Sequence, residues 1–192
     1  MKVRELAIEG ALEFSPTVFA DQRGLFVSPL QEPAFSDATG APFRLARSFH
    51  STSRRGVLRG IHFTTAPPGC AKYIHCARGR ALNFVVDLRE GSPSFGRWDA
   101  VDLDEVSYRA IYLTSGLGHA FVALEDDTDM VFLCTAPYRA DDELSVNPLD
   151  PEIGLPVPAG LDPVRSDRDT VAPTLAQALA DGLLPRFEDC RV

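Results

Sequence analysis

The sequence predicts an all-β protein built as an antiparallel barrel or jelly roll. Short apolar runs follow one another through the middle of the chain, separated by clusters of Gly, Pro, Asp and Ser. No long amphipathic helix lies between these runs, so the alternation of strand and helix that builds a parallel α/β sheet is missing. The length of 192 residues suits one domain, whose core needs neither a disulfide nor a metal for stability.

The predicted strands cover most of the chain between residues 57 and 135. The segments at 72–76 and 81–88 are rich in residues that favour strands, and the Arg78-Gly79 pair between them predicts a hairpin. We expect residues 1–50 to add N-terminal strands and residues 51–148 to form the core of the barrel. The apolar segments lie at 57–63, 72–76, 81–88, 98–103, 110–113, 120–124 and 130–135.

The composition shifts from about residue 150 onward. Six of the fifteen prolines lie between Pro151 and Pro185, and strand signals are sparse. A short helix is predicted at 174–183, because Pro173 suits its first turn and Gly182 suits its C-terminal end. We therefore expect residues 149–192 to wrap the barrel as a tail with one short helix, since they are too few for a core of their own.

The charge balance excludes several classes of partner. The formal net charge is −8, from 19 basic and 27 acidic residues, whereas nucleic acids and anionic membranes bind basic surfaces. The N-terminus lacks the apolar segment of a signal peptide, and no run of about 18 apolar residues could span a bilayer. We expect a cytoplasmic protein with neither a nucleic-acid nor a membrane partner, although a local basic cluster could bind a small anion.

Neither the cysteines nor the histidines indicate a metal site. The cysteines form no CxxC pair and lack zinc-ribbon spacing, so free thiols are expected. No HxH pair occurs, although metal-binding jelly rolls commonly use two histidines at that spacing. The expectation is therefore no metal and no cofactor. The residues concerned are Cys70, Cys76, Cys134, Cys190, His50, His62, His75 and His119.

One histidine lies in a segment that suits catalysis. On an extended strand at 57–63, Arg59 and Ile61 point to one face and Gly60 and His62 to the other, so we expect His62 to face the interior beside Gly60. A histidine there can act as a general base near neutral pH, and a structural role is the alternative. His75 is expected to be a half-buried structural residue.

Lys72 and the segment at 166–169 are further candidates. The chain uses arginine seventeen times and lysine only at Lys2 and Lys72, so a lysine inside a predicted strand suggests an ammonium that stabilises an oxyanion in a pocket. The alternative is an edge-strand lysine that discourages aggregation. The segment at 166–169, SDRD, offers carboxylates that could orient a histidine and an arginine for a phosphate, although such clusters are common where helices begin.

Six short motifs follow one another along the chain, and their combination is specific for one protein family. The chain resembles the dTDP-4-dehydrorhamnose 3,5-epimerases over most of its length, and the branch that serves antibiotic deoxysugars most of all. This resemblance implies a metal-free cupin jelly roll that binds a dTDP-linked 4-keto-6-deoxysugar and forms a homodimer with exchanged N-terminal strands, residues 1–50 including the dimer arm. The motifs are DxRGxF at 21–26, GVLRGIHF at 56–63, AKY at 71–73, VDLRxGSPSFGxW at 86–98, GHAF at 118–121 and SDRD at 166–169.

The resemblance also implies roles for individual residues. His62 is the base, Asp169 orients it, and Lys72 stabilises the enolate that forms next to the C4 ketone. The expected binding residues are Arg59 and Arg168 for the diphosphate, Arg23 and Phe26 for the nucleotide across the dimer, Tyr138 for stacking on thymine, Glu143 for the nucleotide and His119 in the same pocket.

Three departures from the family pattern stand out. Phe132 occupies the place of the proton-donor tyrosine, and a phenyl ring has no proton to give. Ser28 replaces a glutamate, and Arg47 and Phe49 replace a glutamine and an asparagine. The first departure affects catalysis, and the others change the pocket around the nucleotide and the sugar.

The resulting functional expectation is an epimerase that removes a proton through His62 and inverts one carbon, C3 rather than C5. Two alternatives remain: a catalytically silent, ligand-binding member of the fold, and a different isomerase of nucleotide-linked ketosugars.

Overall fold

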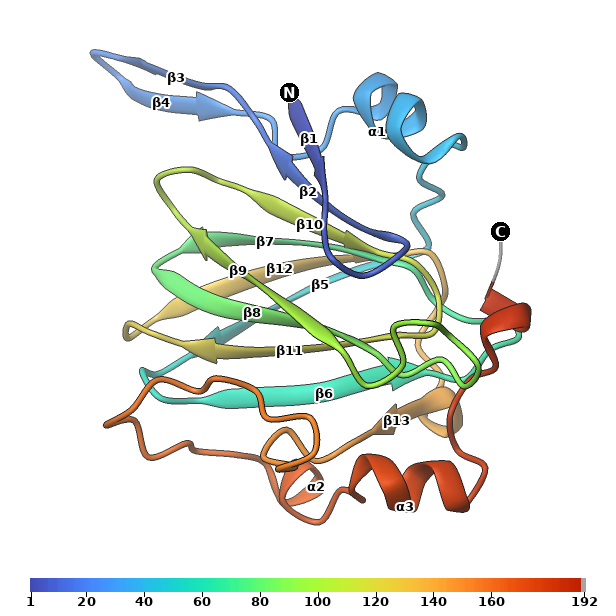
Figure 1. The fold of residues 1–192 in the computed structure, drawn as a ribbon. Coiled ribbons are helices and arrows are strands. Elements are labelled where there is room, and N and C mark those ends of the chain that lie inside the picture. Colours follow the sequence, from blue (N-terminus) through green and yellow to red (C-terminus); the bar gives the residue numbers. More distant parts are fainter. Residues whose placement is uncertain (191–192) are drawn as a thin grey trace.

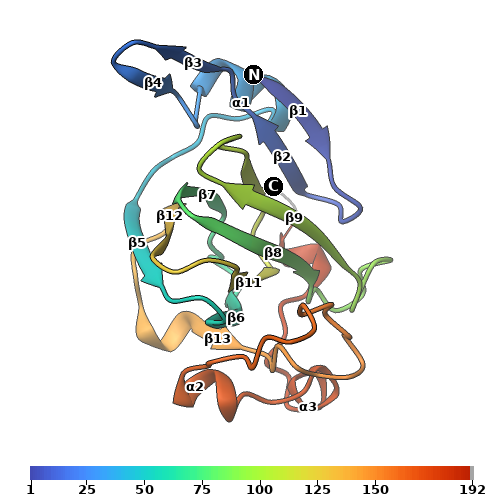
Figure 2. The same cartoon turned by 90° about the vertical axis from the view of Figure 1, so that its left-hand side faces the viewer.

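Two antiparallel sheets pack face to face in the computed structural model, which describes residues 1–190 (Figure 1, Figure 2). This arrangement confirms the predicted jelly roll. The six-stranded sheet has the order β1 (Lys2–Glu5), β2 (Ala11–Ser15), β10 (Ala110–Leu113), β7 (Lys72–Arg78), β12 (Thr128–Cys134) and β5 (Arg47–Ser53). The five-stranded sheet has the order β13 (Glu143–Ser145), β6 (Leu58–Thr64), β11 (Leu117–Ala123), β8 (Arg80–Asp87) and β9 (Trp98–Asp104).

The predicted hairpin around Arg78 and Gly79 is wrong. Strand β7 pairs with β10 and β12, whereas β8 pairs with β9 and β11, so the chain passes from one sheet to the other at Gly79. Gly79 has φ +73°, and a Cβ there would lie 2.8 Å from Thr128 Oγ1. The same turn residues occur in hairpins and in turns that lead from one sheet to the other, so the local sequence does not distinguish the two.

The core between the sheets follows from the alternation of side chains along each strand. On β7, Ile74 and Cys76 point inward, and on β8 Ala81 and Val85 do so; all four are at most 1% exposed. The opposite faces of the same strands pack against elements outside the sandwich. The central strands β7 and β8 are therefore covered on both faces.

Helix α1 (Glu32–Thr39) covers the outer face of the six-stranded sheet, and the sequence analysis did not predict it. Its one buried residue, Phe35, packs on Phe14 and Tyr73 of the sheet at ring distances of 5.8 and 6.2 Å. Pro33 lies in the first turn, and Gly40 ends the helix in the left-handed conformation. The helix connects the N-terminal strands to β5.

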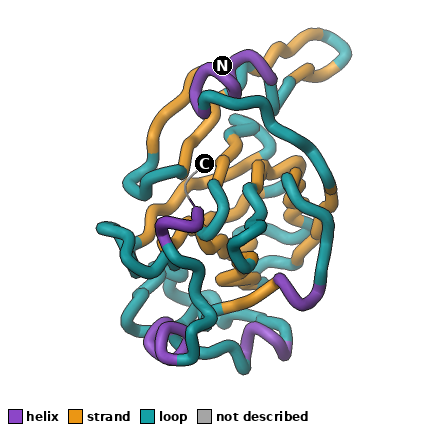
Figure 3. The backbone as a smooth tube through the Cα atoms, turned by 90° about the vertical axis from the view of Figure 1, so that its right-hand side faces the viewer, coloured by secondary structure: helices purple, strands orange, loops and turns teal. Residues whose placement is uncertain are grey.

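The C-terminal tail covers the outer face of the five-stranded sheet, and Figure 3 shows its helices at 167–170 and 175–180 at the end of the molecule opposite α1. The predicted helix is shorter than expected: α3 spans Leu175–Ala180, with Pro173 outside it and Thr174 as its N-cap. A capping box with Gln177 fixes this start. Two further short helices lie in the tail, α2 (Asp167–Thr170) and η2 (Phe187–Cys190), and a third, η1 (Ala140–Asp142), lies just before β13.

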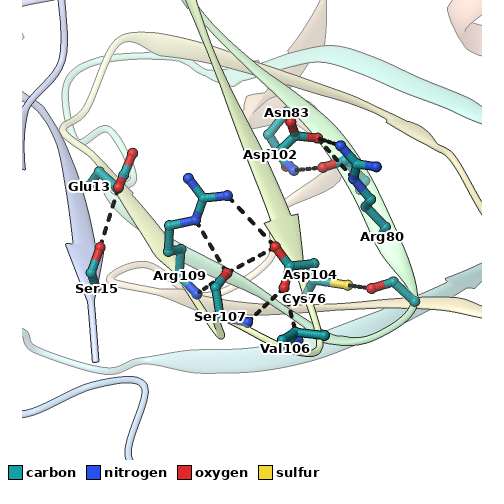
Figure 4. A network of polar contacts seen from close by, with 12 residues as sticks. Glu13, Ser15, Cys76, Arg80, Asn83, Asp102, Asp104, Val106, Ser107 and Arg109 are labelled. Carbon is teal, nitrogen blue, oxygen red and sulfur yellow. Dashed lines mark hydrogen bonds and ion pairs between the residues drawn. The ribbon is translucent and has the colours of Figure 1, made fainter. Parts of the chain in front are cut away.

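A carboxylate stabilises the crossing from β9 to β10. Asp104 accepts hydrogen bonds from the backbone amides of Val106 and Ser107 and from the Ser107 hydroxyl, and Arg109 lies 3.7 Å away (Figure 4). Burial raises the pKa of Asp104, but these hydrogen bonds outweigh burial and hold it below its usual range.

A hairpin of β3 (Val18–Asp21) and β4 (Gly24–Val27) projects away from the two sheets (Figure 1). Phe19, Leu25 and Phe26 on this hairpin are 61%, 52% and 69% exposed. Strand β1, at the edge of the six-stranded sheet, is exposed along its whole length. No helix among residues 1–190 is both long and apolar enough to cross a membrane.

Candidate active site

A cavity of about 170 Å³ opens between the two sheets and collects most of the predicted site residues. Strands of both sheets line it, so the site belongs to the interior of the jelly roll. A larger cavity of about 680 Å³ lies beneath α1, but neither a histidine nor Lys72 lines it. The residues around the smaller cavity are Arg47, Phe49, Ser51, Arg59, His62, Lys72, His119, Phe121, Phe132 and Glu143.

His62 and Asp169 form a hydrogen-bonded pair, as the sequence analysis expected. His62 Nε2 lies 2.7 Å from Asp169 Oδ1, and the Asp169 side chain is 2% exposed. Ser166 is the N-cap of α2 and accepts a hydrogen bond from the Asp169 amide, while Asp169 Oδ2 accepts from the Gly60 amide at 3.3 Å. The SDRD segment is thus both a helix start and the support of the histidine.

The charge state of this pair follows from its contacts. Burial raises the pKa of Asp169, but hydrogen bonds from His62, Gly60 and Ser166 outweigh burial and hold it below its usual range. An ionised carboxylate only accepts hydrogen bonds, so His62 Nε2 carries the hydrogen. The lone pair of the neutral ring is then on Nδ1.

The predicted alternation on β6 is wrong. Arg59 and His62 line the same cavity, although strict alternation places them on opposite faces. Between the pairs Arg59–Phe121 and His62–His119, β6 has one residue more than β11, which is a β-bulge. Gly60, at φ +119°, lies in this bulge, and a Cβ there would lie 2.5 Å from the His119 carbonyl oxygen.

Lys72 lies inside the pocket, as predicted. It is 7% exposed and belongs to β7, a central strand between β10 and β12, so the edge-strand alternative is wrong. No described carboxylate forms an ion pair with Lys72. Its positive charge is strong enough to lower the pKa of the nearby His119, after the larger effect of burial. The ammonium is therefore free to meet a negative oxygen of a ligand.

An aromatic wall closes one side of the cavity. Phe132 stacks on Phe49 with a ring distance of 4.6 Å and an interplanar angle of 3°. The Arg47 guanidinium lies 4.9 Å from the Phe49 ring centre and 5.1 Å from that of Tyr138. Arg47 also forms an ion pair with Glu143 at 3.3 Å. Three of the residues that depart from the family pattern therefore lie together: Phe49 stacks on Phe132, and Arg47 contacts Phe49.

Five predicted binding residues lie outside the cavity lining, and one of them, Tyr138, is 59% exposed with its ring against the Arg47 guanidinium. Arg23 is bound to Asp21 at 2.6 Å on the projecting hairpin that also carries Phe26, and the Ser28 hydroxyl donates to the Leu30 carbonyl. Arg168 donates to the Glu143 carbonyl at 2.7 Å, which places it near the rim. Within this chain, the hairpin residues do not reach the pocket.

The remaining histidines and cysteines lie apart from the cavity lining. His75 is half-buried, as predicted; burial lowers its pKa, and its Nδ1 has no hydrogen-bond partner among the described residues. The four cysteines are free and buried. Within residues 1–190, no group of three or more His, Cys, Asp or Glu side chains could hold a metal ion.

Sequence reasoning missed Ser51, Phe121 and Asn83. Ser51 and Phe121 each lie two residues beyond a predicted site residue, Phe49 and His119, on the same face of a strand, so the alternation of β5 and β11 contained the signal. Asn83 hydrogen-bonds to His119 at 3.0 Å. It lies between the inward-facing Ala81 and Val85 of β8, and a polar residue at such a place is a sequence signal as well.

The fold and the site are those of an isomerase of the epimerase type: a histidine–carboxylate pair suited to moving a proton lies at the same small cavity as a lysine. The chain belongs to the dTDP-4-dehydrorhamnose 3,5-epimerase family, whose sequence model matches residues 5–177.

Relatives in the family are named for epimerisation at one carbon or at two carbons of the sugar. A dTDP-4-dehydrorhamnose 3,5-epimerase of Mycolicibacterium smegmatis is 47% identical over 191 residues, covering 100% of this chain and 94% of that relative. A crystal structure of a 4-keto-6-deoxy sugar epimerase from the novobiocin gene cluster of Streptomyces spheroides has a TM-score of 0.97 at 46% identity and covers 100% and 96% of the two chains.

A third relative is a 3′-monoepimerase. The enzyme, from Streptomyces bikiniensis, was solved with dTDP-quinovose; its TM-score is 0.93 at 47% identity, covering 96% of this chain and 93% of that one. It was also solved with dTDP as a double variant in which one histidine is asparagine and one tyrosine is phenylalanine.

Proposed function

We propose that this protein is an epimerase of a dTDP-4-keto-6-deoxyhexose in the biosynthesis of antibiotic deoxysugars, and that it inverts one carbon, C3. The observation that carries the proposal is the 2.7 Å pair of His62 and Asp169, which faces the same cavity as Lys72. Such a pair suits removal of a proton from a carbon next to a ketone. The relatives' activities, single and double inversion of dTDP-linked ketosugars, agree with it.

The reaction begins with proton removal. His62 Nδ1 takes the C3 proton, and Asp169 stabilises the imidazolium through its hydrogen bond to Nε2. The electron pair of the C3–H bond moves toward the C4 oxygen, which becomes an enolate. Lys72 stabilises this oxyanion because its ammonium lies inside the pocket, where water screens the charge less than in bulk solution.

Reprotonation from the opposite face completes the inversion. A tyrosine at position 132 could supply this proton, but Phe132 cannot. We assign the role to water: a water molecule gives its proton to C3, and the resulting hydroxide is neutralised by the proton on His62. This last proton transfer restores both the water molecule and the neutral His62 ring. The restricted supply of protons on that face is the reason to expect inversion at one carbon only.

Two features of the pocket support an anionic, polar ligand. Arg47, Arg59 and Lys72 line the cavity, whereas Glu143 is the one carboxylate in its lining. Arg47 Nε and Ser51 Oγ are buried without a hydrogen-bond partner among the described residues, so both are available to a ligand. The arginine fork suits a diphosphate, with Arg168 at the rim.

The nucleotide half of the site is completed by a second copy of the chain in this proposal. The β3–β4 hairpin projects with Phe19, Leu25 and Phe26 exposed, and it carries Arg23. A homodimer with exchanged N-terminal segments would bury these side chains and bring Arg23 and Phe26 to the partner's nucleotide, with Tyr138 stacking on thymine.

Deuterium exchange tests the proposal directly. The protein is incubated with dTDP-4-keto-6-deoxyglucose in D₂O, and label at C3 and C5 is followed by NMR. We expect deuterium at C3 with inversion and none at C5. Label with inversion at both carbons would overturn the single-centre proposal, and label at neither would show that the chain lacks this activity.

The Phe132→Tyr variant tests the account of reprotonation. It restores a hydroxyl on the aromatic wall, and we expect deuterium and inversion at C5 in addition to C3. The matched control is Phe49→Tyr, which adds the same hydroxyl to the stacked neighbouring ring and should leave the product pattern unchanged. An unchanged pattern in Phe132→Tyr would contradict the role given to this position.

A further inference from the structure

His62 and His119 are direct partners across β6 and β11, and each is anchored through Nε2. The anchors differ in charge. His62 is held by the carboxylate of Asp169 at 2.7 Å, and His119 by the amide oxygen of Asn83 at 3.0 Å. A carboxylate stabilises an imidazolium strongly, whereas an amide does so only weakly.

The orientation of the Asn83 amide is determined by its second contact. Asn83 is fully buried, and its Nδ2 donates to the Ala81 carbonyl at 3.3 Å. A carbonyl cannot donate, so the NH₂ group must face Ala81 and Oδ1 must face His119. Oδ1 only accepts, so His119 Nε2 carries the hydrogen. In the neutral ring Nδ1 is then an acceptor, and no described residue donates to it.

The surroundings of His119 also disfavour a charged ring. Burial lowers the pKa of His119 well below its usual range, and the positive charges of Lys72 on β7 and His62 on β6 lower it further. The other charged groups at the cavity are Arg47 on β5, Arg59 on β6 and Glu143 on β13. Within residues 1–190, no carboxylate hydrogen-bonds to His119.

We propose that Asn83 is a positioning residue that holds His119 as a neutral hydrogen-bond acceptor, so that His62 is the one imidazole in the pocket that carries the transferred proton. This inference rests on the proposed function. It explains why two adjacent histidines in one pocket do not compete: one exchanges protons, and the other orients an O–H group of the bound ketosugar through Nδ1.

The protonation state of His119 is measurable without any assay of activity. In the ¹⁵N-labelled protein, whose 192 residues include four histidines, NMR reports the tautomer of each ring. We expect His119 to carry its hydrogen on Nε2 and to remain neutral between about pH 5 and 8, the range in which an ordinary histidine titrates. Titration of His119 in that range, or a hydrogen on Nδ1, would overturn the proposal.

The Asn83→Asp variant is the matched substitution. A carboxylate at the same place should let His119 take up a proton within this pH range. At pH values below the midpoint of this His119 titration, kcat should be lower by at least about tenfold, because the charged ring no longer accepts a hydrogen bond. Above the midpoint kcat should approach the wild-type value. The control is Asn147→Asp, the same change at the chain's other asparagine, which should leave the pH profile as in wild type.

The outcomes separate this inference from the proposed function. A neutral, Nε2-protonated His119 in a protein that incorporates no deuterium would leave the positioning of His119 intact and contradict the epimerase assignment. An active protein in which Asn83→Asp folds and gives the wild-type pH profile would contradict the role of Asn83. If Asn83→Asp does not fold, the wild-type NMR measurement still decides.

Discussion

At the scale of single residues, the 2.7 Å bond between His62 and Asp169 decides which nitrogen of the imidazole meets the ligand. Because Asp169 holds Nε2, the basic nitrogen is Nδ1. Asp169 in turn is held by the Gly60 amide and the start of α2. His62, the proposed base, is thus oriented by contacts from two segments more than a hundred residues apart in the sequence.

Removing the base should remove exchange at carbon. We expect His62→Asn to slow deuterium incorporation at C3 by about 10²- to 10⁴-fold, the usual contribution of a positioned general base. Asp169→Asn should slow it less, because an amide can still hold the ring but stabilises the imidazolium weakly. Both rates are measured by NMR in D₂O, with circular dichroism as the check on folding. Incorporation at the wild-type rate in His62→Asn would contradict the assignment of the base.

A second buried carboxylate concerns stability. Asp87 is fully buried, binds Arg89 through both of its oxygens at 2.8 Å, and accepts hydrogen bonds from Ser92 and Ser94 at 2.6 Å. Burial raises its pKa, but the contacts with Arg89, Ser92 and Ser94 outweigh burial and leave the pKa below its usual range. The ionised form is therefore favoured in the folded protein relative to the unfolded chain.

Asp87→Asn should lower the free energy of unfolding by about 3–5 kcal/mol at pH 7, because Arg89 is left buried without its partner. The contribution of Asp87 is fully present above its unfolded pKa of about 3.9 and is lost as the pH falls toward its lower folded pKa. Urea unfolding at pH 7 and below pH 4 measures this. The control Asp102→Asn, in a partly exposed pair with Arg80, should cost less than about 1 kcal/mol.

The residue types of the site were largely predictable. His62, Lys72 and Asp169 could be inferred because they lie in specific motifs. Phe132 could be inferred because the family pattern has a tyrosine at that place. Asn83 could have been noticed as a polar residue in a buried strand, but its role could not be inferred, since that role depends on a cross-strand contact with His119 that no local pattern contains.

At the scale of elements, the bulge in β6 shapes the pocket. It lets Arg59 and His62 face the same cavity and places Gly60 against the backbone of β11. Alternation along a strand predicts which residues share a face only where the ladder is regular. Strict alternation therefore predicts the face of His62 correctly and that of Arg59 incorrectly. The short α1 was missed for a different reason: with one buried residue, it has hardly any apolar periodicity.

Gly60→Ala should damage both stability and activity. Its Cβ would lie 2.5 Å from the His119 carbonyl oxygen and 2.7 Å from Ala120 Cα, so the backbone must move. We expect a lower Tm and at least about a tenfold loss of kcat, since His62 moves with the strand. The control is Gly91→Ala, which has φ +83° and open space; it should cost only about 1 kcal/mol of stability and leave kcat unchanged. Equal effects of the two substitutions would contradict this account.

At the scale of the whole molecule, the exposed hairpin β3–β4 stands apart from an otherwise well-packed sandwich (Figure 2). Three large apolar side chains on an exposed two-stranded hairpin call for a partner surface, because such hairpins are marginally stable alone. The two-sheet architecture was predictable from strand spacing. The pairing of strands was not, because short turns give no indication of which sheet the next strand joins.

Replacing Phe19, Leu25 and Phe26 together by serine should convert the proposed dimer into a monomer and weaken binding of dTDP about tenfold or more. Sedimentation and calorimetric titration with dTDP measure the two effects. Val106→Ser, at an exposed valine on the β9–β10 turn, is the control and should change neither. If the wild-type protein also sediments as a monomer, and the triple variant binds dTDP as tightly as wild type does, the role of the hairpin is contradicted.

From β5 to β13, every connection except β8 to β9 carries the chain from one sheet to the other. Neighbours in sequence are therefore seldom neighbours in the core, and long loops must close before the contacts between the sheets can form. Chains of this kind fold slowly, on a scale of milliseconds to seconds. A cut anywhere from β6 to β12 would leave neither fragment with a complete sheet. Strands of both sheets line the candidate pocket, so it forms only when the entire sandwich has assembled.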